Sequence, residues 1–313
     1  MNPLTGLYAG IIGLRNALFD HRVLKEERLE RPVVSVGNLS VGGAGKTPFV
    51  IALGELLKAR GIGFDILSRG YRRKTRGALR VETDGTAADF GDEPLLIARR
   101  LGVPVFVGES RYEAGRLAEK QSDGVVHILD DGFQHRSLAR QFDIVLVSES
   151  DFSDKLLPAG RLREPISALA RANAIILPSG FEPGGELPSK PIWRIQRELA
   201  IVDTPASPIA FCGLARPQQF FDQLRSAGIT AAAEVRFRDH HAYAKRDIDR
   251  LLRQQKEVSA GGFVTTEKDA VNLGPWREKL GQVAVMRLNV VIEQADVLAD
   301  TILDRIRNLE RRT

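Results

Sequence analysis

The chain of 313 residues contains a single cysteine, Cys212, and no run of about 20 consecutive apolar residues. One cysteine excludes an internal disulfide and indicates a reducing compartment. The absence of a long apolar run predicts that no helix crosses a membrane. The first basic residue, Arg15, follows an apolar segment instead of preceding it, so a secretory signal peptide is not expected.

Aromatic residues are also few, at 6%, whereas hydrophobic residues make up 43% and charged residues 27% of the chain. This composition is ordinary for a globular protein and excludes a wholly disordered, collagen-like or polytopic membrane protein. The length predicts about two domains. Lysine is scarce, since 34 of the 45 basic residues are arginine and 11 are lysine. Because a guanidinium group binds phosphate and carboxylate in pairs, the bias hints at anionic ligands.

Residues 2–28 are predicted to form one helix, with Asn2 as its cap and Pro3 in its first turn. Apolar residues recur at helical spacing, namely Leu4, Leu7, Tyr8, Ile11, Leu14 and Leu18. The first half carries almost no charge and the second half is rich in basic residues. Two interpretations stay open: the stripe packs on its own domain, or it lies in a membrane interface with basic residues near the headgroups.

After Pro32, short continuous apolar runs alternate with helical segments. The runs predict strands at 33–36, 64–67, 103–107, 125–129, 142–147 and 174–177, and helices at 46–60, 93–101 and 109–120. Continuous apolar strands separated by helices are typical of a parallel sheet that is covered on both faces. The fold class is therefore α/β, with a doubly wound parallel sheet.

A stretch rich in Pro, Gly, Ser and Glu at 178–191 predicts a linker, with a domain boundary near residue 190. Beyond it the pattern predicts strands at 209–212, 232–237, 262–265 and 283–290, and helices at 217–227, 246–258 and 295–309. The predicted parts are an N-terminal helix at 1–30, a nucleotide-binding domain at 31–190 and a smaller α/β domain at 191–313. Ligands of such proteins commonly bind between domains, at the carboxyl ends of strands.

A glycine-rich segment directly follows the first predicted strand, residues 37–48 (GNLSVGGAGKTP). It matches the phosphate-loop pattern G-x-x-x-x-G-K-[ST] except that Ser40 replaces the first glycine. The loop predicts a nucleoside triphosphate site formed by Gly42, Gly43, Ala44, Gly45, Lys46 and Thr47. Lys46 would reach the β- and γ-phosphates, and the Thr47 hydroxyl would bind magnesium.

Two acids, Asp130 and Asp131, end the predicted strand at 125–129. Phosphate-loop enzymes hold magnesium through an acid at this position. Because successive strand residues point to opposite faces, one acid is expected to face the metal and the other the acceptor or a loop. His127, inside the strand, is predicted to be a core histidine with its hydrogen bonds satisfied.

Asp92 precedes the helix predicted at 93–101 and has two open interpretations, a helix cap and a catalytic base. Residues 68–80 contain six basic residues and no acid, so this loop is either solvated or in contact with a nucleotide or polyanion. Arg161 and Arg163 lie in a turn at 157–165, where either could stabilise a transferring phosphoryl group.

His240 and His241 follow the strand predicted at 232–237. A zinc site is disfavoured, since neighbouring side chains diverge and no cysteine cluster accompanies them; an acid-base or orienting histidine fits better. The loop at 265–269 (TTEKD) is either a nucleotide contact or an ion-paired loop, and the residues do not decide between these alternatives.

Several motifs together resemble the tetraacyldisaccharide 4'-kinase family, the lipid A 4'-kinases of Gram-negative bacteria. They are 35–48 (SVGNLSVGGAGKTP), 68–71 (SRGY), 91–94 (GDEP), 130–135 (DDGFQH), 157–165 (LPAGRLREP), 239–241 (DHH) and 266–269 (TEKD). Two departures are visible: Ala44 stands where the family usually has threonine, and Arg238 where it usually has proline.

The resemblance implies a phosphate-loop kinase that uses ATP and Mg²⁺ to phosphorylate the 4'-hydroxyl of an acylated glucosamine disaccharide 1-phosphate, forming lipid IVA. It implies that Asp92 is the general base and pairs with His240, that Asp130 and Asp131 serve magnesium and acceptor, and that Arg163 touches the phosphates. It further implies a peripheral protein on the cytoplasmic face of the inner membrane, anchored by its N-terminal helix. We expect a monomer and no nucleic-acid partner.

The alternative from another class is a regulatory or metal-delivery NTPase, whose glycine-rich loop would look similar. Such proteins that use GTP carry an Asn-Lys-x-Asp loop, which residues 267–269 do not reproduce. A non-enzymatic lipid-binding protein would leave the carboxylates at three strand or helix ends without a role. Both alternatives are therefore disfavoured.

Overall fold

The computed structural model describes residues 3–42, 45–185, 187–201 and 203–310. Its strands form one mostly parallel sheet in which β12 and β8 pair antiparallel, as do β3 and β4. The order is β10 (Ala233–Arg236), β9 (Ile209–Cys212), β11 (Phe263–Thr266), β12 (Val283–Ile292), β8 (Ile192–Ala200), β7 (Ala174–Pro178), β6 (Phe142–Leu146), β1 (Val33–Asn38), β5 (Val126–Asp130), β2 (Phe64–Ser68), β4 (Val105–Val107) and β3 (Leu79–Arg80). The predicted α/β class is confirmed.

Helices cover this sheet and connect its strands. They are α1 (Pro3–Asp20), α2 (Lys46–Ala59), α3 (Ala87–Phe90), α4 (Asp92–Leu101), α5 (Arg111–Gln121), α6 (Pro217–Ser226), α7 (Lys245–Glu257), α8 (Glu267–Leu273), α9 (Trp276–Leu280) and α10 (Ala295–Glu310). Each predicted strand, and each predicted helix after the first, is found with ends within two residues of those expected. All six residues of β1 are buried, which is why this strand has a continuous apolar pattern.

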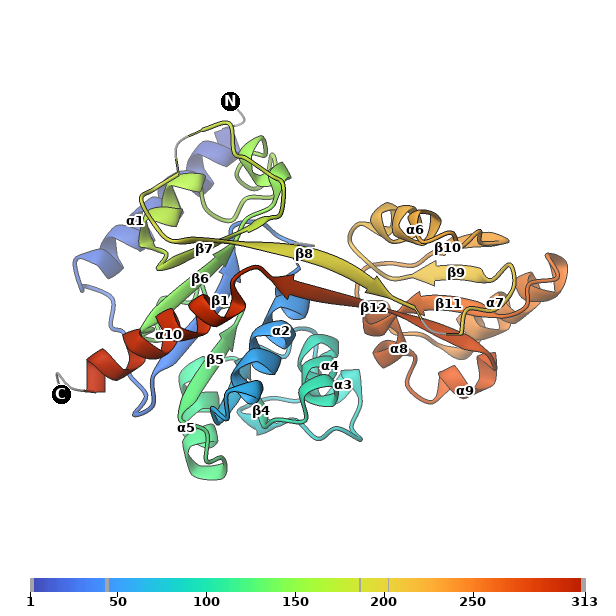
Figure 1. The fold of residues 1–313 in the computed structure, drawn as a ribbon, viewed down its shortest axis with the longest axis horizontal. Helices are drawn as coiled ribbons and strands as arrows, with labels where there is room; N and C mark the ends of the chain where they lie inside the picture. The colour runs from blue at the N-terminus through green and yellow to red at the C-terminus, as the bar shows by residue number, and fades with distance from the viewer. Residues whose placement is uncertain (1–2, 43–44, 186, 202, 311–313) are drawn as a thin grey trace.

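Figure 1 shows two lobes joined by the long strands β8 and β12, which lie side by side. The larger lobe holds β1 to β7 with α1 to α5, and the smaller lobe holds β9 to β11 with α6 to α9. Helix α10 returns to the larger lobe, where Leu298, Ile302 and Ile306 are buried in its core. Arg60 of α2 holds α10 through an ion pair of 2.8 Å between Nη2 and Asp296 Oδ1. The C-terminal end of the stretch 191–313 thus packs on the larger lobe.

The first helix is shorter than predicted, because α1 ends at Asp20 and not near residue 28. Arg22 adopts a left-handed backbone with φ of 57°, and the Val23 amide donates to the Leu18 carbonyl. This hydrogen-bond pattern ends a helix, commonly with glycine at the left-handed position. Beyond the turn, Glu27 exchanges backbone hydrogen bonds with Ser137 and Ala139. The sequence lacks the glycine that would have signalled the end.

His127 lies in the core at the end of the sheet opposite the phosphate loop. Its side chain is fully buried, and Nδ1 lies 2.5 Å from Oδ1 of Asp65. Ser122 donates to the other oxygen of the same carboxylate at 2.7 Å. The prediction that His127 lies in the core is confirmed. The prediction that its hydrogen bonds are satisfied holds only for Nδ1, because Nε2 is buried with no hydrogen-bond partner among the described residues and lies 3.7 Å from Oε1 of Glu119.

Candidate active site

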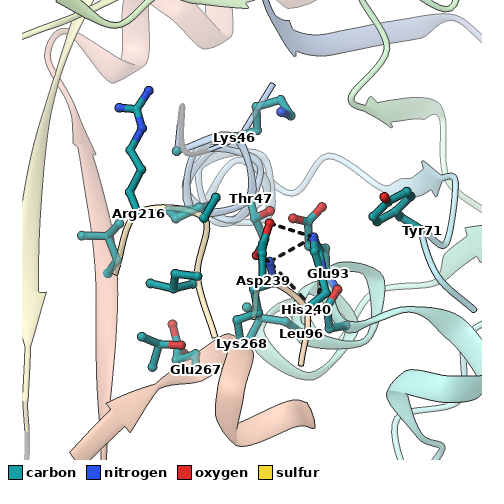
Figure 2. A pocket seen from close by; sticks show the side chains of 18 of the residues that line it. Lys46, Thr47, Tyr71, Glu93, Leu96, Arg216, Asp239, His240, Glu267 and Lys268 are labelled. Atoms are coloured by element: carbon teal, nitrogen blue, oxygen red, sulfur yellow. Dashed lines mark hydrogen bonds and ion pairs between the residues drawn. The ribbon is translucent and has the colours of Figure 1, made fainter. Parts of the chain in front are cut away.

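A cavity of about 760 Å³ opens between the lobes at the carboxyl ends of the parallel strands. Its lining brings together nine of the predicted site residues: Gly42, Gly45, Lys46, Thr47, Asp92, Asp130, Asp131, Arg163 and His240. Figure 2 shows Lys46 and Thr47 from α2 together with Asp239, His240 and Lys268 from the smaller lobe. The two other predicted loop residues, Gly43 and Ala44, lie outside the described residues.

The phosphate loop leads directly into α2, with Gly45 as the residue before the helix. Gly45 has φ of 77°, and a Cβ atom there would lie 2.8 Å from Nη2 of Arg197. The positive φ is what favours glycine here, since an L side chain would be strained, whereas the tip of Arg197 could move away. Arg197 comes from β8, and the sequence analysis did not identify it. Its guanidinium group places a second cation beside the loop.

Lys46 contacts two side-chain oxygens. Its Nζ donates to Asn38 Oδ1 at 2.9 Å and lies 3.3 Å from Asp131 Oδ1. Arg163 donates from Nη1 to both Asp131 oxygens at 2.9 Å. Burial by itself would raise the pKa of Asp131, but Lys46 and Arg163 together lower it to about 2. Asp131 therefore forms ion pairs with both Lys46 and Arg163, the two cations that were predicted to contact phosphates.

Asp130 is almost fully buried and incompletely satisfied. Its Oδ2 accepts from Ser68 Oγ at 3.2 Å, and its Oδ1 has no hydrogen-bond partner among the described residues. Burial, with the nearby carboxylates of Glu93 and Asp131, raises the pKa of Asp130 to about 7. A bound cation would relieve this penalty, and carboxylate and hydroxyl oxygens are ligands that Mg²⁺ prefers. Asp130 and Thr47, which line the same cavity, fit the predicted magnesium site.

The described residues contain no group of three or more His, Cys, Asp or Glu that could hold a metal ion. A zinc centre built wholly from protein ligands usually needs such a group. The oxygen donors at Asp130 and Thr47 instead suit a cation that keeps several waters and binds substrate phosphates.

Asp92 and His240 meet across the cleft, 2.7 Å apart between Oδ2 and Nδ1. Asp92 is the first residue of α4, and Gly91 occupies the cap position, so Asp92 is not the cap. Its Oδ1 accepts from the Glu93 amide at 2.9 Å, and its Oδ2 also accepts from Asn272 Nδ2 at 3.0 Å. Burial would raise the pKa of Asp92, but the hydrogen bond from His240, the charge of Lys268 and Asn272 lower it. The carboxylate is therefore ionised at neutral pH.

The two adjacent histidines have different surroundings. His240 has φ of 54° and turns into the cavity. His241 instead lies 3.0 Å from Asp247 through Nε2 and Oδ2, and its ring stacks on Phe237 with centroids 4.7 Å apart. The expected divergence of neighbouring side chains is confirmed, so the pair does not share a metal.

The segment predicted as a loop at 265–269 is the end of β11 and the start of α8. Its three charged residues separate in space. Glu267 pairs with Arg100 at 2.7 Å, and Asp269 is buried and accepts from the Tyr243 hydroxyl and the Gly213 amide, both at 2.8 Å. Lys268 lines the cavity. Lys268 is also ion-paired, with Asp239 at 3.1 Å, so the ion-paired alternative is confirmed for Glu267 and Lys268.

The basic loop at 68–80 reaches the smaller lobe. Arg72 Nη1 donates to the backbone carbonyl of Asp239 at 2.6 Å, and the Tyr71 ring packs edge-on against His240 with centroids 5.2 Å apart. Arg73 pairs with Glu109 at 2.7 Å within the larger lobe. Part of this loop thus supports the segment that carries His240 instead of extending freely into solvent.

Helix α1 packs on the loops of the site with one face and exposes the other. Tyr8 donates to the Arg163 carbonyl at 3.0 Å, and Asn16 donates to Glu164 at 2.8 Å. Four residues of the apolar stripe are exposed, with exposed fractions of 59% for Leu4, 62% for Leu7, 57% for Ile11 and 64% for Leu14, whereas Tyr8 and Leu18 are half-buried. The interpretation in which the stripe packs on its own domain therefore holds only for its smaller part. Among the described residues, no helix is long and apolar enough to cross a membrane.

Known proteins resemble this chain over its whole length. A model of the family described as Tetraacyldisaccharide-1-P 4'-kinase matches residues 1–307. Two proteins described as tetraacyldisaccharide 4'-kinases come from Koribacter versatilis (strain Ellin345), 46% identical over 100% of this chain and 99% of that protein, and from Aquifex aeolicus (strain VF5), 40% identical over 87% and 88%. A solved structure described as the "apo" form of LpxK from Aquifex aeolicus in complex with ATP has a TM-score of 0.81 and 36% identity, covering 97% of this chain and 98% of that one. The chain belongs to the tetraacyldisaccharide-1-P 4'-kinase family.

Proposed function

We propose that this protein transfers the γ-phosphoryl group of ATP to the 4'-hydroxyl of a tetraacylated glucosamine disaccharide 1-phosphate, forming lipid IVA, with Asp92 as the general base. The observation that carries the proposal is the contact between Asp92 and His240, which lies in one cavity with Lys46 of the phosphate loop. A nucleotide loop alone would fit many proteins. A buried, ionised carboxylate facing that loop fits transfer to an alcohol.

The triphosphate would bind over the loop that precedes α2. Backbone amides of the loop and the positive end of α2 favour phosphate at this position. Lys46 and Arg163 both form ion pairs with Asp131, and the phosphates would take over part of these contacts. Arg197 lies close enough to the loop to add a third cation. The solved relative described as a complex with ATP supports this assignment.

Asp130 and Thr47 would hold Mg²⁺ in this proposal. When bound, Mg²⁺ neutralises charge that develops on the β- and γ-phosphates during transfer. The buried, unpartnered Oδ1 of Asp130 and its raised pKa support the assignment.

The chemical step needs one proton to move. The acceptor hydroxyl gives its proton to Asp92, its oxygen forms a bond to the γ-phosphorus, and the bond from that phosphorus to the β,γ-bridging oxygen breaks, leaving ADP. Because the transition state of phosphoryl transfer is loose, the nucleophile carries little positive charge early, and a carboxylate is a sufficient base. Lys46 and Arg163 would neutralise charge on the transferring group. His240 would orient the carboxylate.

The proposal divides the work between the predicted parts. Residues 31–190 would bind the nucleotide, and residues 191–313 would supply His240 and Arg197. Closure of the smaller lobe would exclude water, which otherwise competes with the lipid as acceptor. We expect the protein to act as a monomer and to bind no nucleic acid.

Incubation of the pure protein with ATP labelled at the γ-phosphate and the acylated disaccharide 1-phosphate tests the function. We expect the label in the lipid at the 4'-position, with one ADP formed for each lipid phosphorylated. Label that appears only in free phosphate would instead support the nucleotide switch. Omission of the disaccharide is the control, and it should leave most of the ATP intact.

We also propose that α1 lies on the cytoplasmic face of the inner membrane. Burying each of its large apolar side chains would stabilise the bound state by roughly 1.5–3 kcal/mol. The contacts of Tyr8 and Asn16 with the loop at 163–164 would place the site next to the lipid that it phosphorylates.

Replacing Leu7, Ile11 and Leu14 together by glutamate tests the membrane proposal. The triple variant should lose most of its binding to vesicles of phosphatidylethanolamine and phosphatidylglycerol, measured by sedimentation. Its melting temperature should change little, because all three side chains are exposed in the folded protein. The control is the triple variant Leu7→Ile, Ile11→Leu and Leu14→Ile, which keeps the three side chains apolar. Undiminished sedimentation of the glutamate variant would refute membrane binding through α1.

A further inference from the structure

Helix α8 forms one wall of the base site, although it was predicted as a loop. Lys268 and Asn272 are four residues apart on this helix and therefore lie on the same face. Lys268 Nζ lies 3.2 Å from His240 Nε2 and 3.1 Å from Asp239 Oδ1. Asn272 Nδ2 donates to Asp92 Oδ2 at 3.0 Å. Figure 2 shows Lys268 against Asp239 and His240.

These neighbours select one state of the His240 ring. An ammonium group has only donors, so the contact with Lys268 requires Nε2 of His240 to be an acceptor. An ionised carboxylate has only acceptors, so the contact with Asp92 requires Nδ1 to carry the proton. Both conditions hold only in the neutral ring protonated at Nδ1. An imidazolium would direct a second N–H at the ammonium of Lys268.

The same helix determines how the Asp92 carboxylate is held. A carboxylate offers about four lone-pair positions. The two lone-pair positions of Oδ2 accept from His240 and Asn272, and one lone-pair position of Oδ1 accepts from the Glu93 amide. One acceptor position on Oδ1 is left, and Asp92 lines the cavity. The base is thus ionised, held on three sides and able to accept one more proton donor.

We propose that α8 is the positioning element of the base: Lys268 donates to Nε2 of His240 and so keeps the ring proton on Nδ1, and Asn272 holds the carboxylate so that Oδ1 receives the acceptor hydroxyl. The inference rests on the proposed role of Asp92 as the base. Lys268 and Asn272 are positioning residues, because they act through His240 and Asp92.

The charged groups around this pair support the assignment. Lys268 lies 4.0 Å from Asp92 Oδ2, and Asp239 is the other carboxylate that faces it directly. Glu93 is the next residue of α4, and its charge acts on Asp130; Asp239 Oδ2 also lies 3.8 Å from His240 Nε2. The other acids of α8 point elsewhere, since Glu267 pairs with Arg100 and Asp269 accepts from Tyr243. Lys268 is thus the cation that α8 contributes to the pair.

Nitrogen-15 NMR of histidine-labelled protein tests the tautomer directly. The His240 signals are assigned by their loss in His240→Gln. We expect a protonated Nδ1 and an unprotonated Nε2 in the wild type, and the signal of a protonated Nε2 in Lys268→Met, where the donor to Nε2 is lost. A wild-type ring protonated at Nε2, or an imidazolium in the wild type, would overturn the inference whether or not Asp92 is the base.

Kinetics test the consequence for the base. In Lys268→Met and in Asn272→Ala, kcat should fall by about tenfold because the base is less well positioned, with little change in KM for ATP, and the acid limb of the kcat profile should move to higher pH. Lys268→Arg, which keeps the charge, should lie closer to the wild type. Lys256→Met, an exposed position on α7, is the control. Unshifted profiles in both variants would overturn the inference.

A double-mutant cycle separates positioning from general damage. In a His240→Gln background, Lys268→Met should lower kcat far less than it does in the wild type, because the ring on which Lys268 acts is gone. Equal losses in both backgrounds would contradict the inference. If instead Asp92 is not the base, the result is different, because Asp92→Asn would then turn over normally whatever the pH profiles of the α8 variants.

Discussion

Asp92→Asn is expected to lower kcat by about 10²- to 10⁴-fold while ATP binds with nearly unchanged affinity. The amide has the same shape as the carboxylate and can still accept from the Glu93 amide, but it cannot take up the proton of the acceptor hydroxyl. Single-turnover transfer of label from ATP to the lipid measures the chemical step, and nucleotide titration measures binding.

Asp84→Asn is the matched control, because Asp84 is an exposed acid of the same lobe. Normal turnover in Asp92→Asn would remove this residue as the base. A loss of ATP affinity as large as the loss of kcat would instead show that Asp92 builds the nucleotide site. The predicted combination, slow transfer with intact binding, distinguishes a base from both alternatives.

Lys46→Met should lower kcat/KM for ATP by about 10²- to 10³-fold, because it removes charge-assisted contacts to the phosphates. Methionine keeps most of the length of the side chain. Lys46 contacts Asn38 and Asp131, and Arg163 would still form its ion pair with Asp131 after the substitution. The variant should therefore fold, which its melting temperature will check.

Lys120→Met, on the exposed side of α5, provides the control for the loss of one lysine. Initial rates at several ATP concentrations give kcat/KM for each variant. An unchanged value for Lys46→Met would mean that the loop before α2 does not hold the triphosphate. That result would contradict the assignment of the whole cavity.

The strands of the larger lobe and the phosphate loop could be predicted from short stretches of sequence. The strands of the larger lobe are continuous apolar runs because both faces of the sheet are covered. The phosphate loop was identified from its glycines and Gly-Lys-Thr, which place backbone amides and a lysine at a helix start. These features depend on neighbours in sequence, so a single sequence carries them.

Contacts between distant residues could not be found in the same way. Asp92 and His240 are separated by 148 positions, and only the resemblance to the kinase family suggested their pairing. Asn272 was missed because residues 265–269 were read as a loop, which hid its helical spacing from Lys268. Strand β8 was missed because it follows the Pro- and Gly-rich linker and is partly exposed. Its place in the sheet comes from pairing with β12.

The end of α1 shows a related limit. No glycine or proline marks the stop at Asp20, and Arg22 takes the left-handed position that glycine usually occupies. The later residues leave the helix because Glu27 finds backbone partners at Ser137 and Ala139, more than a hundred positions away. The exposed stripe of α1 was equally ambiguous, since a buried and an interfacial stripe have the same spacing.

A crystal structure with a non-hydrolysable ATP analogue and the acylated disaccharide tests the central claim most directly. We expect the γ-phosphate against Lys46 Nζ, and the 4'-hydroxyl within about 2.6–3.2 Å of Asp92 Oδ1 and in line with the γ-phosphorus. A nucleotide bound away from the loop at 42–47, or a 4'-hydroxyl held by another base with Asp92 turned aside, would contradict the account.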